Sequence, residues 1–286
     1  MQVNFKGVTA DYQIGPIRSR NILHHVNLCL PSKSFTAIVG HTGAGKSSLL
    51  KTVNGLLLPK EGKIQVGDQT ITPELQSKVV LKHVRQSVGM VFQFPESQLF
   101  AETVEQDICF GPMNFGVSKE EAKKSAKDAI LNVGLEEAVL SASPFSLSGG
   151  QQRRVAIAGV LVMNPDVLVL DEPGAGLDPQ GKEEILTLIK YLHESKGITT
   201  ILVTHDMDDV ARYADDVVVM EKGKVVTYKP VHTFFNDVVQ LHAWSLDLPE
   251  ARRLQLRLEE EANVKLPKVC LTIDDLVAAL IEVGLA

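Results

Sequence analysis

One short stretch of the sequence, GHTGAGKS at residues 40–47, combines glycines with a lysine and hydroxyl side chains. Gly40, Gly45, Lys46 and Ser47 fit the pattern G-x-x-x-x-G-K-[ST], whose backbone N–H groups surround phosphates. The helix expected after this phosphate loop would add its positive end. We expect Lys46 to reach the β- and γ-phosphates of a nucleotide and Ser47 to ligate Mg²⁺. The other residues expected to bind the nucleotide here are His41, Thr42, Gly43, Ala44 and Ser48.

A pair of acids, Asp171 and Glu172, follows an apolar run in VLVLDEPGAGLD at residues 167–178. Burial of the run would place Asp171 at the carboxyl end of a strand, where open α/β sheets bind ligands. An aspartate there can hold Mg²⁺. Glu172 should point the other way, as neighbours on a strand do, and could orient or deprotonate an attacking water. The alternative is an ordinary strand that ends in a solvated acidic turn.

Two further polar residues, Gln93 and His205, end the apolar stretches GMVFQ and TILVTH. At a strand end, Gln93 could sense metal and water, and His205 could bond to a γ-phosphate. The alternative for His205 is a satisfied packing residue, and the alternative for Gln93 is an ordinary polar strand end.

A second stretch with phosphate-binding features is SPFSLSGGQQRR at residues 143–154. Ser148 is suited to cap a helix, and Gly149 and Gly150 would let an anion approach the positive end of that helix. Arg153 and Arg154 lie too far along for a primary phosphate contact, and packing or pairing is their expected role. A simple capped helix start would have the same appearance.

The segments around these residues predict an α/β fold. Strands alternate with helices, which predicts a mostly parallel sheet covered on both faces. Residues 1–40 have the pattern of strands, and about 118–161 are expected to form an all-helical insertion. The expected strands are 34–40, 87–93, 166–172, 199–205 and 216–223, and the expected helices include 46–59, stopped by Pro59, 150–163, 180–195 and 207–214.

Composition limits the possible functions. The chain has 286 residues, of which 44% are hydrophobic, enough for one large domain and a smaller appendage. A net charge of −6 argues against a general nucleic-acid binder. The three scattered cysteines predict reduced core residues and no metal site. No apolar run approaches the roughly 18 residues of a membrane span, and the start lacks a signal peptide. After Pro230 the composition shifts and predicts a small helical tail.

Taken in order, the phosphate loop, Gln93, LSGGQ, VLVLDE, GLD and His205 resemble the ABC (ATP-binding cassette) ATPase family over about residues 1–230. The resemblance implies a P-loop NTPase cassette with an antiparallel β subdomain, a helical signature subdomain and a small helical C-terminal extension. It also implies ATP and Mg²⁺ as cofactors. In this family two cassettes face each other head to tail, and the phosphate loop of one and the signature of the other enclose one ATP. The two phosphate-binding stretches would then be two half-sites.

Several residues acquire roles only through this resemblance. Ser148, Gly149, Gly150 and Gln151 would bind the nucleotide held by the partner's lysine, and Asp178 would contact the partner. Tyr12 would stack on the adenine, although a strand tyrosine also packs well on a core.

The remaining roles concern catalysis and the metal. Glu172, His205 and Gln93 would be the catalytic residues, and Ser47, Gln93 and Asp171 would bind the metal. Gly174 departs from the family pattern, which usually has Thr or Ser there, and a glycine would loosen that turn.

The stretch FQFPESQLF, within residues 90–116, is similar to the ATPase subunits of energy-coupling factor (ECF) transporters, the EcfA type, in its second-subunit form. This implies a peripheral ATPase at the cytoplasmic face of the cell membrane that powers uptake of vitamins or transition-metal ions. Its partners would be a second EcfA-type ATPase, as a heterodimer or a homodimer, an EcfT-like transmembrane subunit and a substrate-binding S-component. Phe94, Leu99 and Phe100 beside Glu96 and Gln98 would suit a groove for EcfT, or could be core.

Two rival functions remain. A conventional ABC importer ATPase differs only in the 90–116 stretch and the tail. A soluble ABC ATPase acting on DNA or ribosomes would have long coiled coils or two fused cassettes, which this sequence lacks. We expect residues 1–230 to form the ATP-binding domain and residues 231–286 a C-terminal dimerisation extension, whereas the transported solute is not encoded here.

Overall fold

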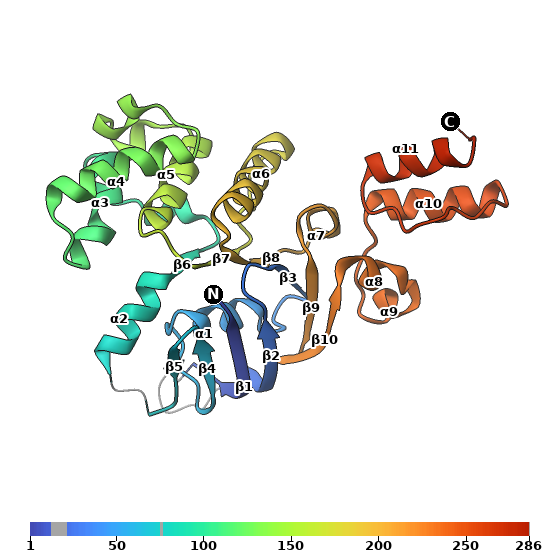
Figure 1. Ribbon diagram of the computed structural model, residues 1–286, viewed down its shortest axis with the longest axis horizontal. Helices are drawn as coiled ribbons and strands as arrows, with labels where there is room; N and C mark the ends of the chain where they lie inside the picture. The colour runs from blue at the N-terminus through green and yellow to red at the C-terminus, as the bar shows by residue number, and fades with distance from the viewer. Residues whose placement is uncertain (13–21, 75–76, 286) are drawn as a thin grey trace.

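The computed structural model describes residues 1–12, 22–74 and 77–285, and its elements are arranged around two sheets (Figure 1). The predicted N-terminal strands are present, but residues 13–21 of the range expected to hold them lie outside the described residues. The larger sheet has the strand order β10-β9-β3-β8-β7-β6, parallel except for the β9–β10 pair. Its strands are β3 (Phe35–Val39), β6 (Val88–Val91), β7 (Val167–Asp171), β8 (Thr199–Val203), β9 (Asp216–Glu221) and β10 (Lys224–Pro230).

The central strands of this sheet are buried on both faces. Every residue of β3, β7 and β8 is buried, because neighbouring side chains point to opposite faces and each face has its own core. In β7, Val167 and Val169 pack toward the antiparallel sheet, while Leu168 and Leu170 pack toward the helices. These continuous apolar runs are why the sequence predicted the sheet.

The smaller sheet is antiparallel, with the order β2-β1-β4-β5. It packs with helix α1 against one face of the larger sheet. Its strands are β1 (Val3–Ala10), β2 (Leu23–Leu30), β4 (Glu61–Val66) and β5 (Gln69–Ile71), and α2 (Lys78–Ser87) follows them. This sheet is the antiparallel subdomain that the ABC resemblance implied, although only its first two strands were visible in the sequence pattern.

Helix α1 (Lys46–Val53) is shorter than predicted. The prediction of a helix over residues 46–59 was wrong, because the chain leaves the helix six residues before Pro59. The turn contains Gly55, whose φ of +68° is a left-handed conformation that favours glycine. Glycine, rather than proline, therefore marks the end of this helix.

The helical side of the molecule is formed by α3 (Val104–Asn114), α4 (Lys119–Asn132) and α5 (Gly149–Leu161), which pack on one another (Figure 1). Short 3₁₀ turns lie between them at η1 (Pro95–Gln98), η2 (Glu137–Ser141) and η3 (Pro144–Ser146). The helical group thus begins at Val104, whereas the expected range began at about 118. Gly111 and Pro112 inside α3 obscured it, since both residues oppose helix in sequence terms.

The remaining helices of the main body are α6 (Pro179–Lys196) and α7 (Met207–Tyr213). After β10 come α8 (Val231–Asn236), α9 (Val238–Ala243), α10 (Glu250–Glu261) and α11 (Ile273–Glu282). Helices α10 and α11 pack on each other at the far end of the molecule (Figure 1) and enclose a core of their own. Among the helices in the described ranges, none has the length and apolar character required to cross a membrane.

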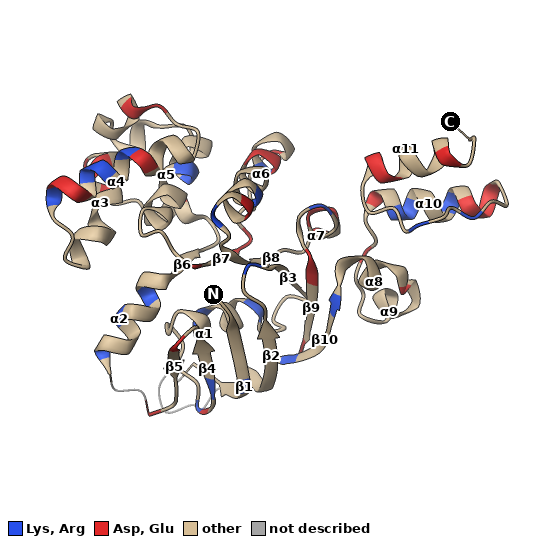
Figure 2. Ribbon diagram, in the orientation of Figure 1, with Lys and Arg blue, Asp and Glu red and all other residues tan. Residues whose placement is uncertain are grey.

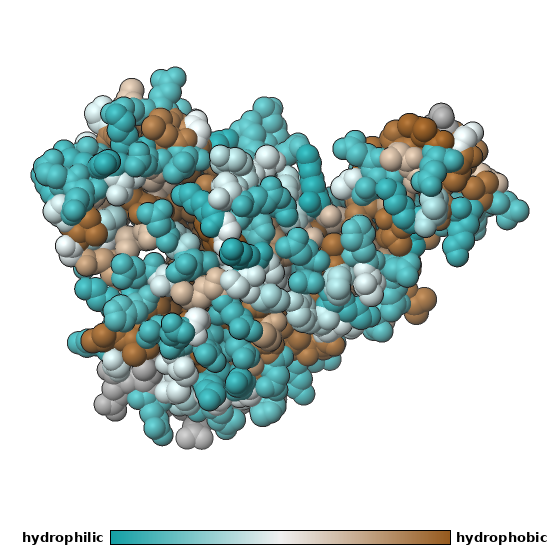
Figure 3. All heavy atoms as spheres, viewed as in Figure 1, coloured by the Kyte–Doolittle hydropathy of each residue, from teal (hydrophilic) through white to brown (hydrophobic). Residues whose placement is uncertain are grey.

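Charge is dispersed over this fold. Basic and acidic residues alternate along α4, α6 and α10 (Figure 2), and ion pairs such as Lys123–Glu105 and Lys127–Glu137 join the helices. The exposed apolar residues of α11, by contrast, gather on one surface (Figure 3). They are Ile273, Val277 and Ile281.

Candidate functional site

The phosphate loop joins β3 to α1, as the sequence predicted. The loop leads directly into α1, and the backbone of Gly45 at the helix start has φ +101°. The ammonium of Lys46 donates hydrogen bonds to the carbonyl oxygens of Gly40 (2.7 Å) and His41 (3.1 Å), so it lies across the mouth of the loop. Burial lowers the pKa of Lys46, whereas the carboxylates of Glu172 and Asp171 act to raise it.

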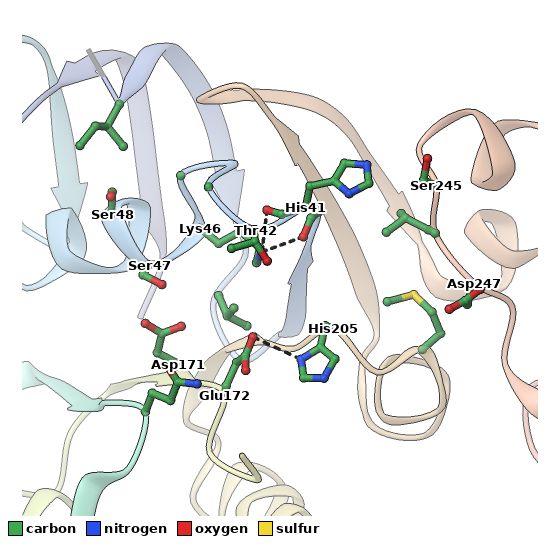
Figure 4. Close-up of a pocket in the computed structure, with 18 residues that line it drawn as sticks. His41, Thr42, Lys46, Ser47, Ser48, Asp171, Glu172, His205, Ser245 and Asp247 are labelled. Atoms are coloured by element: carbon green, nitrogen blue, oxygen red, sulfur yellow. Dashed lines mark hydrogen bonds and ion pairs between the residues drawn. The ribbon is translucent and has the colours of Figure 1, made fainter. Parts of the chain in front are cut away.

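Asp171 ends β7 beside the first turn of α1. Figure 4 shows the side chains of Ser47 and Asp171 pointing toward each other. Burial raises the pKa of Asp171, the nearby Ser47 hydroxyl opposes that change, and the charge of Glu172 reinforces it. A hydroxyl and a desolvated carboxylate placed together are the oxygen ligands that Mg²⁺ prefers.

Glu172 does not turn away from Asp171, and this expectation was wrong. The residue lies one position beyond the strand and has φ +49°, a left-handed conformation that ends the alternation of side chains. Its backbone amide donates a hydrogen bond of 3.0 Å to the carbonyl oxygen of Val203, and this bond fixes the turn. Both carboxylates therefore reach the same cavity (Figure 4).

His205 and Glu172 face each other across this cavity. The imidazole Nδ1 lies 3.3 Å from Oε1 of Glu172, and the imidazole is 76% exposed. Exposure of this size leaves the ring accessible to a ligand and excludes the packing role that the sequence left open. Gln93 is exposed and lines the same cavity.

The cavity has a volume of about 840 Å³ and gathers most of the predicted phosphate-loop and catalytic residues (Figure 4). It is also lined by residues that the sequence did not indicate. Ser245, Leu246 and Asp247, from the segment before α10, form one wall, and Met207 lies beside them in α7. No composition or spacing signal in the tail could have identified them. The predicted residues that line the cavity are Gly40, His41, Thr42, Gly43, Gly45, Lys46, Ser47, Ser48, Gln93, Asp171, Glu172 and His205.

Two of the predicted nucleotide contacts lie beside this cavity and do not line it. Ala44 is buried, and its carbonyl accepts a hydrogen bond from the amide of Gly223. Tyr12 lies next to α1, with its hydroxyl 3.4 Å from the Ser48 hydroxyl and the Lys51 ammonium 5.4 Å from its ring centre. The tyrosine lines a neighbouring cavity of about 580 Å³.

The signature stretch lies apart from the cavity, at the exposed start of α5, while α1 lies on the other side of the central strands (Figure 1). Ser148 caps the helix: its hydroxyl accepts from the Gln151 amide, and the Gln151 side chain accepts from the Ser148 amide. Asp178 likewise caps α6, accepting from the amide of Gly181 at 3.0 Å. Both stretches are presented to the exterior within this one chain.

The two arginines after the signature pair with acids, as expected. Arg153 is 2% exposed and binds Glu96 through two hydrogen bonds of 2.9 and 2.7 Å. It also donates to the carbonyl oxygens of Pro173 and Ala175, just beyond Glu172. Burial opposes ionisation of Glu96, but hydrogen bonds, above all from Arg153, outweigh that effect and lower its pKa.

The aromatic residues around η1 differ in exposure. Leu99 is buried and belongs to the core, whereas Phe94 and Phe100 are exposed. The ring of Phe100 packs edge-on against Phe110 of α3, with centroids 4.9 Å apart. This exposed aromatic surface continues along α3 to a cavity of about 340 Å³ lined by Phe110 and Met113.

Comparison with known proteins adds independent findings. Residues 23–175 match the family model described as ABC transporter. The chain is 52% identical to the energy-coupling factor transporter ATP-binding protein EcfA2 of Listeria innocua, covering 98% of this chain and 97% of that protein. It is 49% identical to the protein of the same name from Geobacillus kaustophilus, covering 98% and 96%.

Solved structures agree with the fold. A structure of cbiO1 from Clostridium perfringens, described as part of the ABC transporter complex cbiONQ, is similar with a TM-score of 0.73 and 36% identity, covering 91% of this chain and 97% of that chain. A dimeric ATP-binding cassette in a post-hydrolysis state, bound to ADP and phosphate, is similar with a TM-score of 0.70 and 31% identity, covering 80% and 98%.

Proposed function

The chain belongs to the ABC transporter family, and we propose that it is the ATP-hydrolysing subunit of an energy-coupling factor transporter. The observation that carries this proposal is the cavity in which the phosphate loop, Asp171, Glu172 and His205 converge. Its lysine, hydroxyl and carboxylate groups match the parts needed for phosphoryl transfer to water. The near-full-length similarity to EcfA2 proteins supports the transporter assignment.

Each residue of the cavity has a role in this proposal. Lys46 and the loop amides bind the β- and γ-phosphates. Ser47 and Asp171, whose side chains point toward each other, are the pair that fits Mg²⁺, and Gln93 lines the same cavity. Within the described residues no group of three or more His, Cys, Asp and Glu side chains could hold a metal, which suits an ion that takes one or two protein ligands and substrate phosphates.

Hydrolysis is assigned to Glu172 and His205. The Glu172 carboxylate orients a water molecule and accepts its proton as the water oxygen attacks the γ-phosphorus. The bond from the γ-phosphorus to the oxygen that bridges it to the β-phosphate breaks, and ADP and phosphate are released. His205, 3.3 Å from that carboxylate, bonds to the γ-phosphate. Mg²⁺, when bound, neutralises the charge that develops on the phosphate oxygens.

The second half of each site comes from a paired chain. Ser148, Gly149, Gly150 and Gln151 bind the nucleotide of the partner, and Asp178 contacts the partner across the interface. Their exposed position at the starts of α5 and α6 supports this role. The partner is a second ATPase of the EcfA type, as a heterodimer or a homodimer. Tyr12, close to α1, stacks on the adenine once the nucleotide is bound.

The membrane partners follow from the family. The subunit binds peripherally at the cytoplasmic face of the cell membrane, to an EcfT-like transmembrane protein that carries an S-component. The exposed Phe94, Phe100 and Phe110 near Glu96 offer the docking surface. A vitamin or a transition-metal ion is the transported solute, and the S-component selects it.

The domain division is part of the same proposal. Residues 1–230 bind ATP, and residues 231–286 form a dimerisation extension. The apolar surface of α11 (Figure 3) is suited to pairing with a second chain. Ser245, Leu246 and Asp247 lie within residues 231–286 and form a wall of the cavity, so removal of this segment would affect more than pairing.

The test of the proposed function is Lys46→Ala. The variant loses the charge on the β- and γ-phosphates and should lose tight Mg-ATP binding, measured by equilibrium titration of the purified chain. Wild-type affinity in this variant would contradict the assignment. Purification of the assembled complex tests the transporter type: an EcfT-like protein and a small substrate-binding membrane protein support it, and an external binding protein refutes it.

A further inference from the structure

Gly174 departs from the family pattern, and the structure shows a specific reason for it. The backbone of Gly174 lies outside the left-handed region, so its conformation alone does not require glycine. A Cβ at this position would lie 2.6 Å from Cγ of Lys182 and 3.3 Å from its Cδ. The three atoms nearest to that Cβ all belong to Lys182. Glycine at position 174 therefore makes room for one side chain, that of Lys182.

The side chain admitted in this way binds two acids of the next segment. The Lys182 ammonium forms ion pairs with Asp206 and, at 2.8 Å, with Asp209. Burial acts to lower the pKa of Lys182, but the hydrogen bonds to these two acids dominate and raise it. The lysine is therefore a permanent cation at ordinary pH, placed between α6 and the start of α7.

These contacts hold both neighbours of His205. The Thr204 hydroxyl donates to Asp209 at 3.2 Å, and the Asp206 amide donates to the Thr204 hydroxyl oxygen at 3.1 Å. Lys182 closes the network by binding the two carboxylates. His205 itself is 76% exposed, so its position depends on the residues on either side.

The lysine also lies directly behind the catalytic pair. A small cavity of about 170 Å³ is lined by Glu172 and His205 together with Gly174 and Lys182. The chain that connects these residues is short, since Gly174 follows Glu172 by two positions and Lys182 lies in the first turns of α6 after Asp178. The stem of Lys182 thus lies against Gly174, in the segment after Glu172, and its ammonium ends on two acids of the segment that carries His205.

We propose that Lys182 is a positioning residue for His205, and that Gly174 is the matching residue that admits it. The ammonium binds Asp206 directly and holds Thr204 through Asp209, and in this way keeps the imidazole against Glu172. Without the cation, the Asp206 and Asp209 carboxylates would repel each other, and the backbone at His205 would move with Asp206. This inference rests on the proposed function, because it concerns the geometry of ATP hydrolysis.

The first experiment compares Lys182→Met with Lys182→Arg in the assembled transporter. In both cases the catalytic glutamate of the partner ATPase is also substituted, so that turnover reports on the site of this chain. Lys182→Met keeps the length of the side chain without its charge. We expect kcat for ATP to fall roughly tenfold to a hundredfold, because small displacements of a catalytic group have effects of this order. KM for ATP should change less than about twofold, since the phosphate loop binds the nucleotide. Lys182→Arg should restore most of kcat.

The matched control is Lys190→Met. Lys190 lies on the same helix and also pairs with acids, Glu194 at 3.6 Å and Asp215 at 3.9 Å, but unlike Lys182 it does not line the small cavity beside Glu172 and His205. Its substitution should leave kcat unchanged. A wild-type kcat in Lys182→Met, or an equal loss of kcat in the two variants, would overturn the proposal.

The second experiment tests the match with Gly174 by a double-mutant cycle. Gly174→Thr should displace the lysine stem and lower kcat as Lys182→Ala does, and the double variant should be no worse than either single variant. Additive losses would show that Gly174 and Lys182 act separately, which contradicts the match. Lys46→Ala separates the two proposals: its loss of Mg-ATP binding supports the proposed function, whatever the Lys182 variants do.

Discussion

The chain contains two glycine-containing stretches that are predicted to bind phosphate, and their glycines differ in what surrounds them. In the phosphate loop, Gly40 has φ +138°, and a Cβ there would lie 2.2 Å from the Met220 carbonyl oxygen. In the signature stretch, Gly149 and Gly150 have helical backbones with nothing within 4 Å of an added Cβ. The first stretch needs its glycine for the fold of this chain. The second does not.

This difference identifies which half of the site is complete. The phosphate loop has Lys46, the proposed metal ligands and the proposed catalytic acid Glu172 gathered around one cavity. The signature has a capped helix start and two small exposed residues, and none of residues 148–151 lines that cavity. Glycines that the fold does not require are explained by close approach of a molecule from outside the chain. The comparison therefore supports the pairing of two chains from the packing of one.

The prediction with the largest expected effect tests the cavity around the phosphate loop. Glu172→Gln keeps the size and hydrogen bonding of the side chain but removes its charge. Binding depends on Lys46, Ser47 and the loop amides, so it should survive, while hydrolysis falls by roughly 10²–10⁴. Affinity by titration and ATP turnover in the assembled complex measure the two quantities, with the partner's matching glutamate substituted in parallel.

Asp171→Asn is the contrasting variant, because the Asp171 carboxylate points toward Ser47 at the expected metal position. It should weaken Mg-dependent ATP binding as well as turnover. Turnover at the wild-type rate in Glu172→Gln would remove that residue from catalysis. Unchanged Mg dependence in Asp171→Asn would remove Asp171 from the metal site.

The contrast between Asp171 and Glu172 also shows what could not be predicted from the sequence. Their types and their place after an apolar run were sufficient to predict a metal ligand and a catalytic base. The strand period predicted that Glu172 would point away from Asp171, yet a left-handed turn at Glu172 brings both to one cavity. Local backbone conformation of a non-glycine residue has no reliable signal in composition or period.

Contacts between residues far apart in the sequence were also not predicted. The buried strands β3, β7 and β8 were predicted because their apolar runs are local features. The wall formed by Ser245 and Asp247 was not, because it depends on how the segment after α9 returns to the cavity. Nor was the link of Arg153 to Glu96, which lies 57 positions away in the sequence. Such contacts arise from tertiary packing, which a single sequence does not display.

The prediction with an intermediate effect concerns Arg153, which joins helix α5 to the segment just beyond Glu172. Arg153→Met leaves the Glu96 carboxylate and two carbonyl groups without their buried partner. We expect the free energy of unfolding to fall by about 3 kcal/mol. Arg154→Met is the control, because Arg154 pairs with a half-exposed Glu184 and its loss should cost at most about 1 kcal/mol. Urea denaturation of the purified chains measures both.

The pH dependence of this contact has a defined sign. The pKa of Glu96 is lowered in the folded protein, so the stabilisation is present above its ordinary value of 4.5 and is lost as pH falls through the folded value. The Arg153→Met variant should lose less stability on acidification than the wild type over that range. Equal stability losses in the Arg153 and Arg154 variants would contradict the anchoring role of Arg153.

The smallest expected effect tests the signature glycines directly. Gly150→Ala adds a methyl group in open space at a helical position, so the free energy of unfolding should stay the same or rise by up to about 1 kcal/mol. Gly40→Ala is the matched substitution in the other stretch, where the carbonyl of Met220 blocks the methyl group, and it should destabilise the chain by about 3 kcal/mol.

ATP turnover of the paired chains should nevertheless fall in Gly150→Ala, because the methyl group obstructs the nucleotide held by the partner. Denaturation of the single chain and turnover of the pair must be measured on the same preparations. A Gly150→Ala chain that is clearly destabilised would mean that the glycine serves its own fold, and the distinction between the two stretches would be lost.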